Sequence, residues 1–407
     1  MTSKDGTVLF LEHEASRTGA SIFLLRLLSW LRTDSNFDFR ILAGRWGELL
    51  PEFRSVGMVD AFEPEPKLAY RFIRRLKSNN WQQSKHLHAL REKLAQSDIR
   101  LIYANSVASA RMLDFLSFLQ CPVICHVHEL NGAIQTLGSQ SIHILEKYKP
   151  HYIAVSHAVA ENLTRKHRIP ANRVRVIYGF VPVSEFSPRE ANLQESIRRE
   201  IGIPRETKII CGCGSIEHRK GTDIFVEVAR TVIRRNEALP AHFVWIGGTP
   251  DGVETMRKRL TRLGLTDRVH FIGSKSNVAP YFEAADIFLL TSREDPFPLV
   301  MLEAALHKTP IVCFDQTGGA PEFLLNDSGF VVPKFDIEKM SDKVMELLAS
   351  PHLCKQMGEA ARQKVISCHE LSLGAQQIAN VIGERLGLRS ARLALNDSIS
   401  NARRDTF

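Results

Sequence analysis

The segment 292–303, Ser-Arg-Glu-Asp-Pro-Phe-Pro-Leu-Val-Met-Leu-Glu, joins an acidic loop to a helix-like apolar run. Glu294 and Asp295 precede a third acid, Glu303, by nine and eight positions. Carboxylates accept hydrogen bonds from hydroxyl groups, and a helix start offers unpaired N–H groups to an anion. The segment therefore suits a polyhydroxyl ligand that also carries phosphate, such as a sugar attached to a nucleoside diphosphate.

The expected helix in this segment has a proline near its beginning. Pro298 suits the first helical position, where its missing N–H costs nothing, so the N–H groups of Leu299 and Val300 should point out of the helix start. Further along, Gly318 and Gly319 form a glycine turn ahead of another expected helix. The pattern predicts two helix beginnings that face one ligand.

A pair of adjacent cations, Arg219 and Lys220, follows Gly212-Cys-Gly214 and is itself followed by a glycine. Arginine gives forked hydrogen bonds and lysine a point charge, so the pair could clamp a diphosphate. A solvated basic loop is the alternative. The Gly-x-Gly beginning also fits the start of a dinucleotide-binding motif, but Glu217 occupies the position of the third glycine. The chain contains no P-loop sequence.

Two further candidates lie in the first half of the chain. His128 and Glu129 come just after the apolar run that ends at His126, and a histidine at such a position would face a ligand. Gly19 precedes an expected helix and would let backbone approach a ligand closely. A satisfied structural histidine and a glycine needed only for its turn are the alternatives.

The elements that must position these residues alternate between strands and helices. Near-continuously apolar strand-like runs are expected at 7–11, 39–43, 101–104, 123–126, 152–155, 174–178, 208–213, 242–246, 269–272, 287–290 and 311–314. Helical patterns lie between them, including 20–32, 84–95, 106–119, 222–234 and 298–306. This alternation predicts an α/β protein with two doubly wound domains, in which ligands bind beyond the carboxyl ends of the strands.

A chain of 407 residues is too long for one ordinary core, which also favours two domains. The proline- and serine-containing segment 181–188 predicts the boundary, so we expect domains at 1–184 and 185–370 and a polar tail at 389–407. The formal net charge of +8 favours anionic partners, but no nucleic-acid-binding signature is present. We therefore expect no nucleic-acid partner.

The seven cysteines are an odd number, and five of them lie in or beside strand-like runs. Buried free thiols in a reducing compartment are the simplest interpretation, and the spacing of Cys211 and Cys213 matches no zinc motif. No apolar run is long enough to span a bilayer, and the N-terminus does not resemble a signal peptide. We expect a cytoplasmic protein without a metal site.

The basic segment Lys67–Lys77 places Leu68, Phe72 and Leu76 at helical spacing. Such a segment can lie on an anionic membrane surface, which would make the protein peripheral on the inner face of the membrane. A helix that packs by its apolar face and solvates its basic face is the alternative.

Taken together, these motifs resemble the retaining, nucleotide-sugar-dependent glycosyltransferases of the GT-B fold, the group 1 or family 4 type. The resemblance is strongest over 209–332 and weaker around Gly19 and His128. It implies two Rossmann-like domains that face a central cleft, an acceptor-side domain first and a nucleotide-sugar-binding domain second. It also implies a C-terminal helix at 371–388 that packs back on the first domain.

The resemblance assigns roles to particular residues. Arg219 and Lys220 match the cations that hold the donor diphosphate, Glu303 matches the acid that binds the ribose, and His128 matches the histidine that reaches the transferred sugar. Asp295 matches the acid that contacts sugar hydroxyls, although the family usually has glutamate there and the adjacent Glu294 could serve instead. The remaining positions expected to bind the donor are Gly19, Gly214, Gly273, Ser274, Pro298, Leu299, Val300, Gly318 and Gly319.

The implied reaction moves a hexosyl group from a nucleoside-diphosphate sugar to an acceptor hydroxyl with retention of configuration. The acceptor would be a sugar or a lipid-linked molecule in polysaccharide or glycolipid synthesis. No Asp-x-Asp sequence occurs, so we expect neither a metal nor another cofactor. A non-catalytic nucleotide-sugar-binding subunit, a sugar-nucleotide epimerase, a phosphorylase and a nicotinamide oxidoreductase are the rival interpretations.

Overall fold

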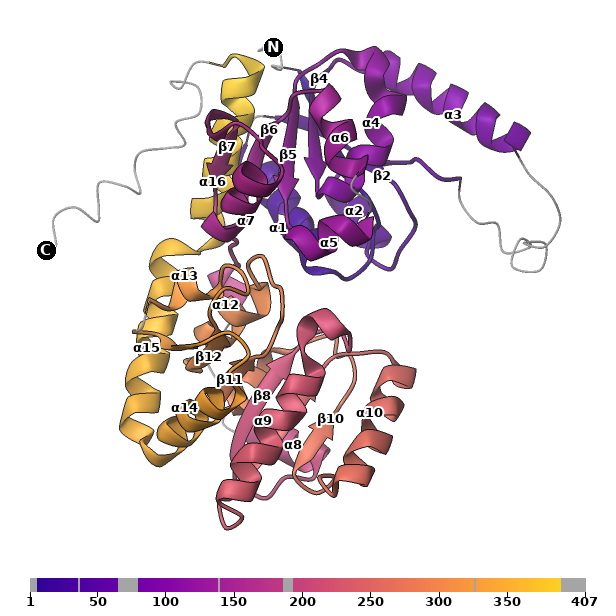
Figure 1. Cartoon of the computed structure of the whole chain (residues 1–407). Coiled ribbons are helices and arrows are strands. Elements are labelled where there is room, and N and C mark those ends of the chain that lie inside the picture. The colour runs from indigo at the N-terminus through magenta and orange to yellow at the C-terminus, as the bar shows by residue number, and fades with distance from the viewer. Residues whose placement is uncertain are drawn as a thin grey trace, which may run out of the picture. The chain divides into compact units, whose positions relative to one another are not determined.

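The computed structural model describes residues 6–35, 37–64, 80–137, 140–185, 193–325 and 327–388 (Figure 1). The chain divides into two compact units. The first runs to Val155 and also contains Ala160–Ile177 and the residues from Leu371 onward. The second contains Ser156–Val159 and Tyr178–Glu370. Each unit has its own parallel sheet, so the predicted fold class of two Rossmann-like sheets is confirmed.

The sheet of the first unit has the order β3-β2-β1-β4-β5-β6-β7, and all of its recorded pairs are parallel. Its strands are β1 (Thr7–Glu12), β2 (Asp38–Ala43), β3 (Met58–Ala61), β4 (Ile99–Asn105), β5 (Val123–Val127), β6 (His151–Ala154) and β7 (Val174–Val176). The central strands are mostly buried on both faces, which accounts for their largely apolar sequences.

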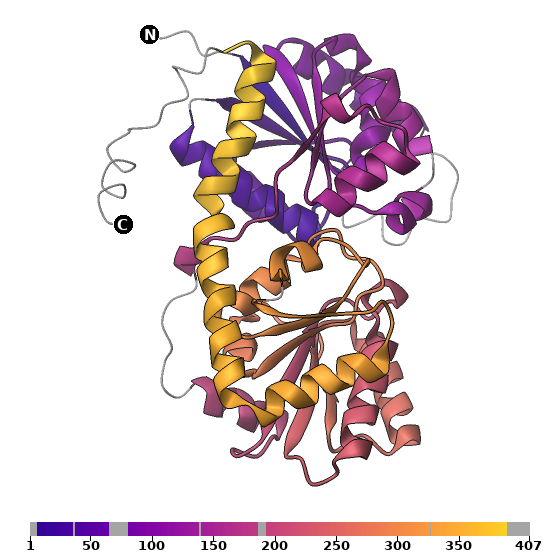
Figure 2. The same cartoon turned by 60° about the vertical axis from the view of Figure 1, so that its left-hand side comes forward.

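The helices of the first unit are α1 (Gly19–Asp34), α2 (Leu50–Val56), α3 (Asn80–Ala95), α4 (Ala110–Leu116), α5 (Asn131–Leu137), α6 (Gln140–Lys147) and α16 (Leu371–Leu386). Helix α7 (His157–Glu161) lies where the two units divide. The chain returns to the first unit through α16, which packs beside α1 (Figure 2). A forked ion pair between Arg175 and Glu384, with N–O distances of 3.1 and 3.0 Å, helps to fix α16 there.

The sheet of the second unit has the order β10-β9-β8-β11-β12-β13. Its strands are β8 (Lys208–Cys213), β9 (Ala241–Ile246), β10 (Val269–Phe271), β11 (Ile287–Leu290), β12 (Ile311–Phe314) and β13 (Gly329–Val332). The order reverses between β8 and β11. This is the switch point beyond which open α/β sheets bind their ligands.

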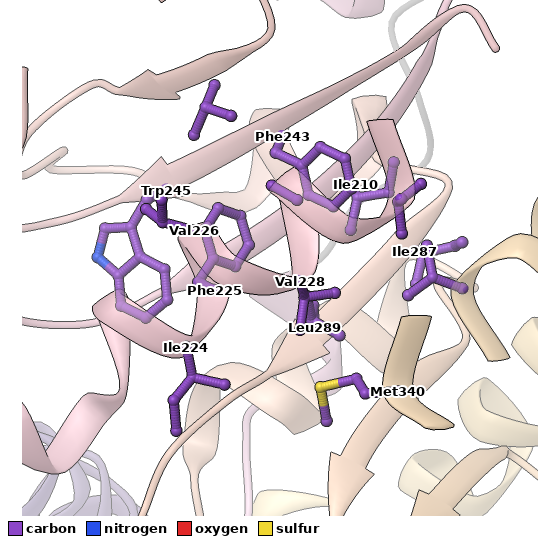
Figure 3. Close-up of a cluster of buried hydrophobic side chains, with 14 of the residues drawn as sticks. Ile210, Ile224, Phe225, Val226, Val228, Phe243, Trp245, Ile287, Leu289 and Met340 are labelled. Carbon is purple, nitrogen blue, oxygen red and sulfur yellow. The ribbon is translucent and has the colours of Figure 1, made fainter. Parts of the chain in front are cut away.

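The helices of the second unit are α8 (Leu193–Ile201), α9 (Thr222–Arg235), α10 (Pro250–Leu263), α11 (Ala279–Ala284), α12 (Leu299–Leu306), α13 (Ala320–Leu324), α14 (Ile337–Ala349) and α15 (Pro351–Cys368). Helix α9 packs against α14, and α12 packs against α11 and α15. One hydrophobic cluster lies between the sheet and the pair α9 and α14, as Figure 3 shows. Alternate residues of each strand face this cluster, as Phe243 and Trp245 do on β9.

The edge strands differ from the sequence predictions because β3 and β13 were not expected. Strand β3 is short and carries Asp60, an acid that breaks the apolar pattern. Asp60 is buried because Arg40 and Lys93 neutralise it, at N–O distances of 2.6 and 2.5 Å. The expected helix at 106–119 is also divided, with 3-10 turns before and after α4.

All seven cysteines are free thiols. Among the described residues, no helix combines the length and apolarity needed to cross a bilayer. The basic segment Lys67–Lys77 and the tail at 389–407 lie outside the described residues.

Candidate functional site

Three loops at the carboxyl ends of β8, β9 and β10 pack closely through glycine backbone. Gly247 accepts no side chain, because its φ is +121° and a Cβ there would lie 2.2 Å from the carbonyl oxygen of Gly214. The N–H of Gly247 donates to the carbonyl of Gly273 at 2.8 Å, and the hydroxyl of Ser274 donates to the carbonyl of Gly248 at 3.1 Å. The structure thus brings the predicted positions 214, 273 and 274 into one set of loops.

Lys220 lies against this loop set and binds the acidic segment after β11. Its Nζ donates to Oδ2 of Asp295 at 2.6 Å, and the hydroxyl of Ser292 reaches the same oxygen at 3.2 Å. The Lys220 and Asp295 side chains are only 15% and 8% exposed. A Cβ built on Gly214 would lie 3.2 Å from the aliphatic stem of Lys220, so this glycine borders the lysine.

Arg219 contacts the same acidic segment from the neighbouring position. One guanidinium nitrogen donates to the carbonyl of Glu294 at 3.1 Å, and another lies 3.0 Å from the carboxylate of Glu217. The Arg219 side chain is 36% exposed. Both predicted cations therefore meet the loop that carries the predicted acids, and Arg219 keeps part of its guanidinium open to solvent.

Arg293 joins these two loops, although it was not among the residues predicted from the sequence. Its guanidinium forms a forked ion pair with Asp223, at 2.7 and 2.6 Å, and donates to the carbonyl of His218 at 2.8 Å. Its backbone N–H donates to the carbonyl of Arg219 at 2.8 Å. Bidentate pairs of this kind fix geometry as well as charge, so Arg293 holds the 218–220 turn against the acidic segment.

Helix α12 begins beside the acidic segment with uncapped amide groups. Pro298 is the N-cap residue rather than the first helical residue, because its ψ of 116° is extended, and the helix starts at Leu299. No side chain in the described structure caps this start. The N–H groups of Leu299 and Val300 therefore belong to the first turn, where an anion is stabilised.

Glu303 follows on the next turn of α12 and is 8% exposed. Its charge acts on the thiol of Cys213, at the end of β8. Burial, aided by Glu303, raises the pKa of that thiol to about 12, and Lys220 opposes the rise. Glu303 and Lys220 thus influence the same strand end, as expected for two members of one site.

The glycine turn after β12 closes the other side of the acidic segment. Gly318 has a φ of +140°, and a Cβ there would lie 1.7 Å from the carbonyl oxygen of Asp295. The N–H of Gly319 donates to the carbonyl of Pro296 at 3.0 Å. Helix α13, which follows, has only five residues and carries Glu322 in its first turn, so it is a much weaker anion site than α12.

His128 and Gly19, the other two predicted positions, belong to the first unit. His128 follows β5 and is half-buried, and its Nε2 lies 3.0 Å from Oδ1 of Asn105. Burial, together with the charge of His13, lowers the pKa of His128 to about 3. Its neighbour Glu129 is buried and accepts hydrogen bonds from the backbone N–H groups of His128, at 2.9 Å, and Val107, at 3.3 Å.

Gly19 is the first residue of α1 and follows its N-cap, Thr18. Its φ is not in the left-handed range, and a Cβ there would meet no atom of the chain within 4 Å. Neither the turn nor packing within the protein therefore requires glycine. His126, the last residue of the expected strand at 123–126, is fully buried, and its Nδ1 lies 2.6 Å from the hydroxyl of Tyr103.

Two family models match successive parts of the chain. The one described as "Glycosyltransferase Family 4" matches residues 17–185, and the one described as "Glycosyl transferases group 1" matches residues 194–364. Together they account for most of both units. The chain belongs to the group 1 glycosyltransferases with the GT-B fold.

Curated relatives of this group 1 glycosyltransferase include N-acetyl-alpha-D-glucosaminyl L-malate synthase of Bacillus anthracis, 27% identical over 213 residues, which are 52% of this chain and 54% of the relative. The lipopolysaccharide core biosynthesis mannosyltransferase LpcC of Rhizobium leguminosarum bv. viciae is 28% identical over 221 residues, 52% of this chain and 60% of the relative. The matched part of the chain spans little more than half the length of these relatives.

Solved structures share the fold at lower identity. Anabaena HepE in complex with UDP-glucose superposes with a TM-score of 0.78 at 19% identity, over 93% of this glycosyltransferase and 100% of that chain. WaaG, a glycosyltransferase involved in lipopolysaccharide biosynthesis, gives a TM-score of 0.69 at 15% identity, over 92% and 99% of the two chains. At such identities the likeness establishes the fold alone.

Sequence reasoning on this family member missed residues that orient the predicted ones. Asn105 ends the strand before the one that leads to His128, so the strand-end rule that selected His128 would also have selected Asn105. Arg293 carries no comparable signal, because an arginine in an acidic loop is usually a solvated charge. Only the fold shows that Asp223, seventy positions away, is its partner.

Proposed function

We propose that this chain is a retaining, metal-independent hexosyltransferase that uses a nucleoside-diphosphate sugar as donor. The observation that carries the proposal is the site of the second unit, where Arg219, Lys220 and the open start of α12 meet two acids, Asp295 and Glu303. Amides and cations suit a diphosphate, and carboxylates suit the hydroxyl groups of a ribose and a sugar.

Lys220 would bind the donor without leaving Asp295. An ammonium group has three N–H donors, and among the described residues Asp295 is the one recorded side-chain partner of Lys220. Its other N–H groups can reach a phosphate oxygen. As the glycosidic bond breaks, the diphosphate gains charge, and donors already held in place stabilise that charge without reorganisation.

The acids would divide the two sugar units of the donor between them. Glu303 binds the ribose, as the resemblance implies. Lys220 and Ser292 both donate to Oδ2 of Asp295, whereas its Oδ1 has no recorded partner within the described chain. Asp295 can therefore offer Oδ1 to the transferred sugar. This division favours Asp295 over Glu294 as the acid that contacts the sugar.

The proposed chemistry is attack by the acceptor hydroxyl on the face from which the diphosphate leaves. The departing phosphate takes the proton of that hydroxyl, so the bond to the acceptor forms as the bond to phosphate breaks. His128 contacts the transferred sugar, and Gly19 leaves room for the donor phosphates. These last two roles rest on the family resemblance.

The choice of substrates to test follows from the relatives. HepE binds UDP-glucose, so UDP-hexoses come first among donors. One relative is named for L-malate, others for D-inositol 3-phosphate and others for lipopolysaccharide core, so acceptors should include small anionic alcohols and lipid-linked sugars. We propose polysaccharide or glycolipid synthesis as the setting.

A donor panel tests the proposal. The chain is incubated with uridine, guanosine and adenosine diphosphate hexoses, with and without acceptors, and release of nucleoside diphosphate is measured. We expect slow hydrolysis of one donor, faster release with an acceptor, full activity with a chelator and a product whose anomeric configuration matches that of the donor. Donor binding without release under any condition would instead indicate a non-catalytic nucleotide-sugar-binding subunit.

We also propose that the protein is cytoplasmic and that an anionic membrane surface is a further partner. The membrane contact is inferred from the basic sequence of Lys67–Lys77. Sedimentation with anionic vesicles tests it, and charge reversal at Arg71, Arg74 and Arg75 should release the protein. Failure of the unchanged protein to sediment would remove the membrane from the proposal.

A further inference from the structure

Three central strands of the first sheet carry a completely buried polar residue at or next to their carboxyl ends. Glu12 ends β1, Asn105 ends β4 and His126 lies at the end of β5, and each is 0% exposed. The register pairs Glu12 with Asn105 and Asn105 with His126, so the strand ends lie side by side. His128 is two residues beyond His126 and therefore points to the same side of the chain.

The hydrogen bonds of Asn105 leave one possible orientation for its amide. Its Nδ2 donates to Oε2 of Glu12 at 3.0 Å and to the carbonyl of Ala20 at 3.1 Å. The carbonyl of Ala20 has no hydrogen to give. If the amide were turned over, its oxygen would face these two acceptors and lose both bonds. Oδ1 must therefore face Nε2 of His128, at 3.0 Å.

This orientation decides which nitrogen of His128 carries the hydrogen. Because Oδ1 of Asn105 can only accept, Nε2 of His128 must donate. The ring is neutral at physiological pH, since burial and the charge of His13 lower its pKa to about 3. In a neutral imidazole the second nitrogen, Nδ1, is then a lone-pair acceptor. Nδ1 has no recorded hydrogen-bond partner within the described residues, and His128 as a residue is only half-buried.

A second set of bonds holds the backbone at the same place. Glu129 accepts from the N–H of His128 at 2.9 Å and from the hydroxyl of Ser106, which follows Asn105 directly. Ser106 adopts a φ of +84° and a ψ of 147°, a conformation that non-glycine residues rarely adopt. The chain accepts this strain where it orients both Asn105 and His128.

We propose that Asn105, itself oriented by Glu12, is a positioning residue that fixes His128 as the Nε2–H tautomer, so that Nδ1 accepts a hydrogen bond from a ligand hydroxyl. His128 would then act as an acceptor and not as a proton donor to the substrate. That the hydroxyl belongs to a sugar rests on the proposed function, whereas the tautomer does not.

The test is nitrogen-15 NMR of the full chain labelled at histidine, in which long-range correlations distinguish protonated from unprotonated ring nitrogens. His128→Gln identifies the His128 signals among those of the fifteen histidines. At pH 7 we expect hydrogen on Nε2 and none on Nδ1. In Asn105→Leu the tautomers should mix. The double variant Glu12→Gln/Asn105→Asp keeps an acceptor oxygen for His128 and removes the carboxylate that would repel the second oxygen, so it should retain the hydrogen on Nε2.

Tyr103→Phe is the matched control, because it removes the partner of the adjacent ring. It should change the His126 signals and leave those of His128 in place. Hydrogen on Nδ1 in the unchanged protein, or an unaltered tautomer in Asn105→Leu, would overturn the proposal. If Asn105→Leu does not fold, loss of the Nε2 hydrogen in Glu12→Gln/Asn105→Asp would overturn the proposal in the same way.

Activity provides an independent second measurement. Asn105→Leu should lower kcat about tenfold, the effect of one lost neutral hydrogen bond, and Glu12→Gln/Asn105→Asp should recover part of it. A chain that shows the expected tautomer but turns over no donor contradicts the proposed function and leaves the positioning role intact. An unchanged kcat in Asn105→Leu, with tautomers mixed, would show that the tautomer has no part in transfer.

Discussion

The ion pair between Lys220 and Asp295 can be tested separately for stability and for activity. Lys220→Met removes the cation and leaves the carboxylate, 8% exposed, with the Ser292 hydroxyl as its remaining recorded partner in the described structure. Removing one partner of a buried pair typically costs about 3–5 kcal/mol. For a unit of this size each kcal/mol lowers Tm by about 2–4 °C, so we expect a fall of about 10 °C.

The double variant Lys220→Met/Asp295→Asn removes both charges and should recover much of this loss. Residues in direct contact usually show interaction energies of about 0.5–3 kcal/mol in such a cycle, and this pair should lie in the upper part of that range. Lys308→Met is the matched control, because Lys308 and Glu359 form an ion pair at 2.7 Å with side chains 46% and 42% exposed. Its loss should cost at most about 1 kcal/mol.

Activity follows a different pattern, since the proposed diphosphate contact needs Lys220 itself. Release of nucleoside diphosphate should fall about 10²–10³-fold in Lys220→Met and stay low in the double variant, although its stability returns. A single variant as stable as the Lys308→Met control would refute the reasoning from burial. Near-normal turnover in the stable double variant would refute the role of Lys220 in catalysis.

Three further predictions use other parts of the structure. Gly19→Ala should raise the free energy of unfolding by about 0.4–1 kcal/mol, because the helical backbone accepts alanine. It should also raise the KM for donor, because the added methyl group would take the space proposed for the donor phosphates. An unchanged KM would mean that no ligand approaches this glycine. Glu303→Gln should weaken binding of nucleoside diphosphate about tenfold or more by titration calorimetry, through loss of a charge-assisted hydrogen bond, while binding of inorganic diphosphate stays the same. Burial and the neighbouring His270 lower the pKa of His242 to about 4, below its usual 6.5. The free energy of unfolding that depends on neutral His242 is therefore complete above pH 6.5 and is lost as pH falls toward 4. Denaturant titrations at several pH values should show a shallower loss of this free energy in His270→Gln, and an equal loss in both proteins would contradict the coupling.

The sequence was sufficient to predict the central strands, because short, nearly continuous apolar runs are typical of parallel strands that helices cover on both faces. Strands β8, β11 and β12 have the predicted bounds. Edge strands were not predictable in this way. Asp60 interrupts β3, and only the fold reveals that Arg40 and Lys93 reach it from distant positions. When the partners of a buried charge lie elsewhere in the chain, the local sequence pattern cannot predict those partners.

The site was predictable at the level of loops but not of side-chain partners. The strand-end rule correctly brings Arg219 and Lys220 to the acidic segment. It does not show that Lys220 pairs with the very acid that the family pattern assigns to the sugar. Pro298 likewise lies one position earlier in its helix than expected, since the extended ψ at an N-cap depends on the chain before it.

The pairing of each cation with an acid also indicates how a diphosphate would be held. Arg219 lies beside Glu217, and Lys220 beside Asp295, so these four residues contribute almost no net charge. Attraction by net positive charge is therefore a weak explanation for binding. Directed N–H donors remain, from the two cations and from the open start of α12. Because such donors are held by Asp295, Glu217 and the helix itself, they need no rearrangement when charge develops on the leaving group, and this is the property that a catalytic site requires.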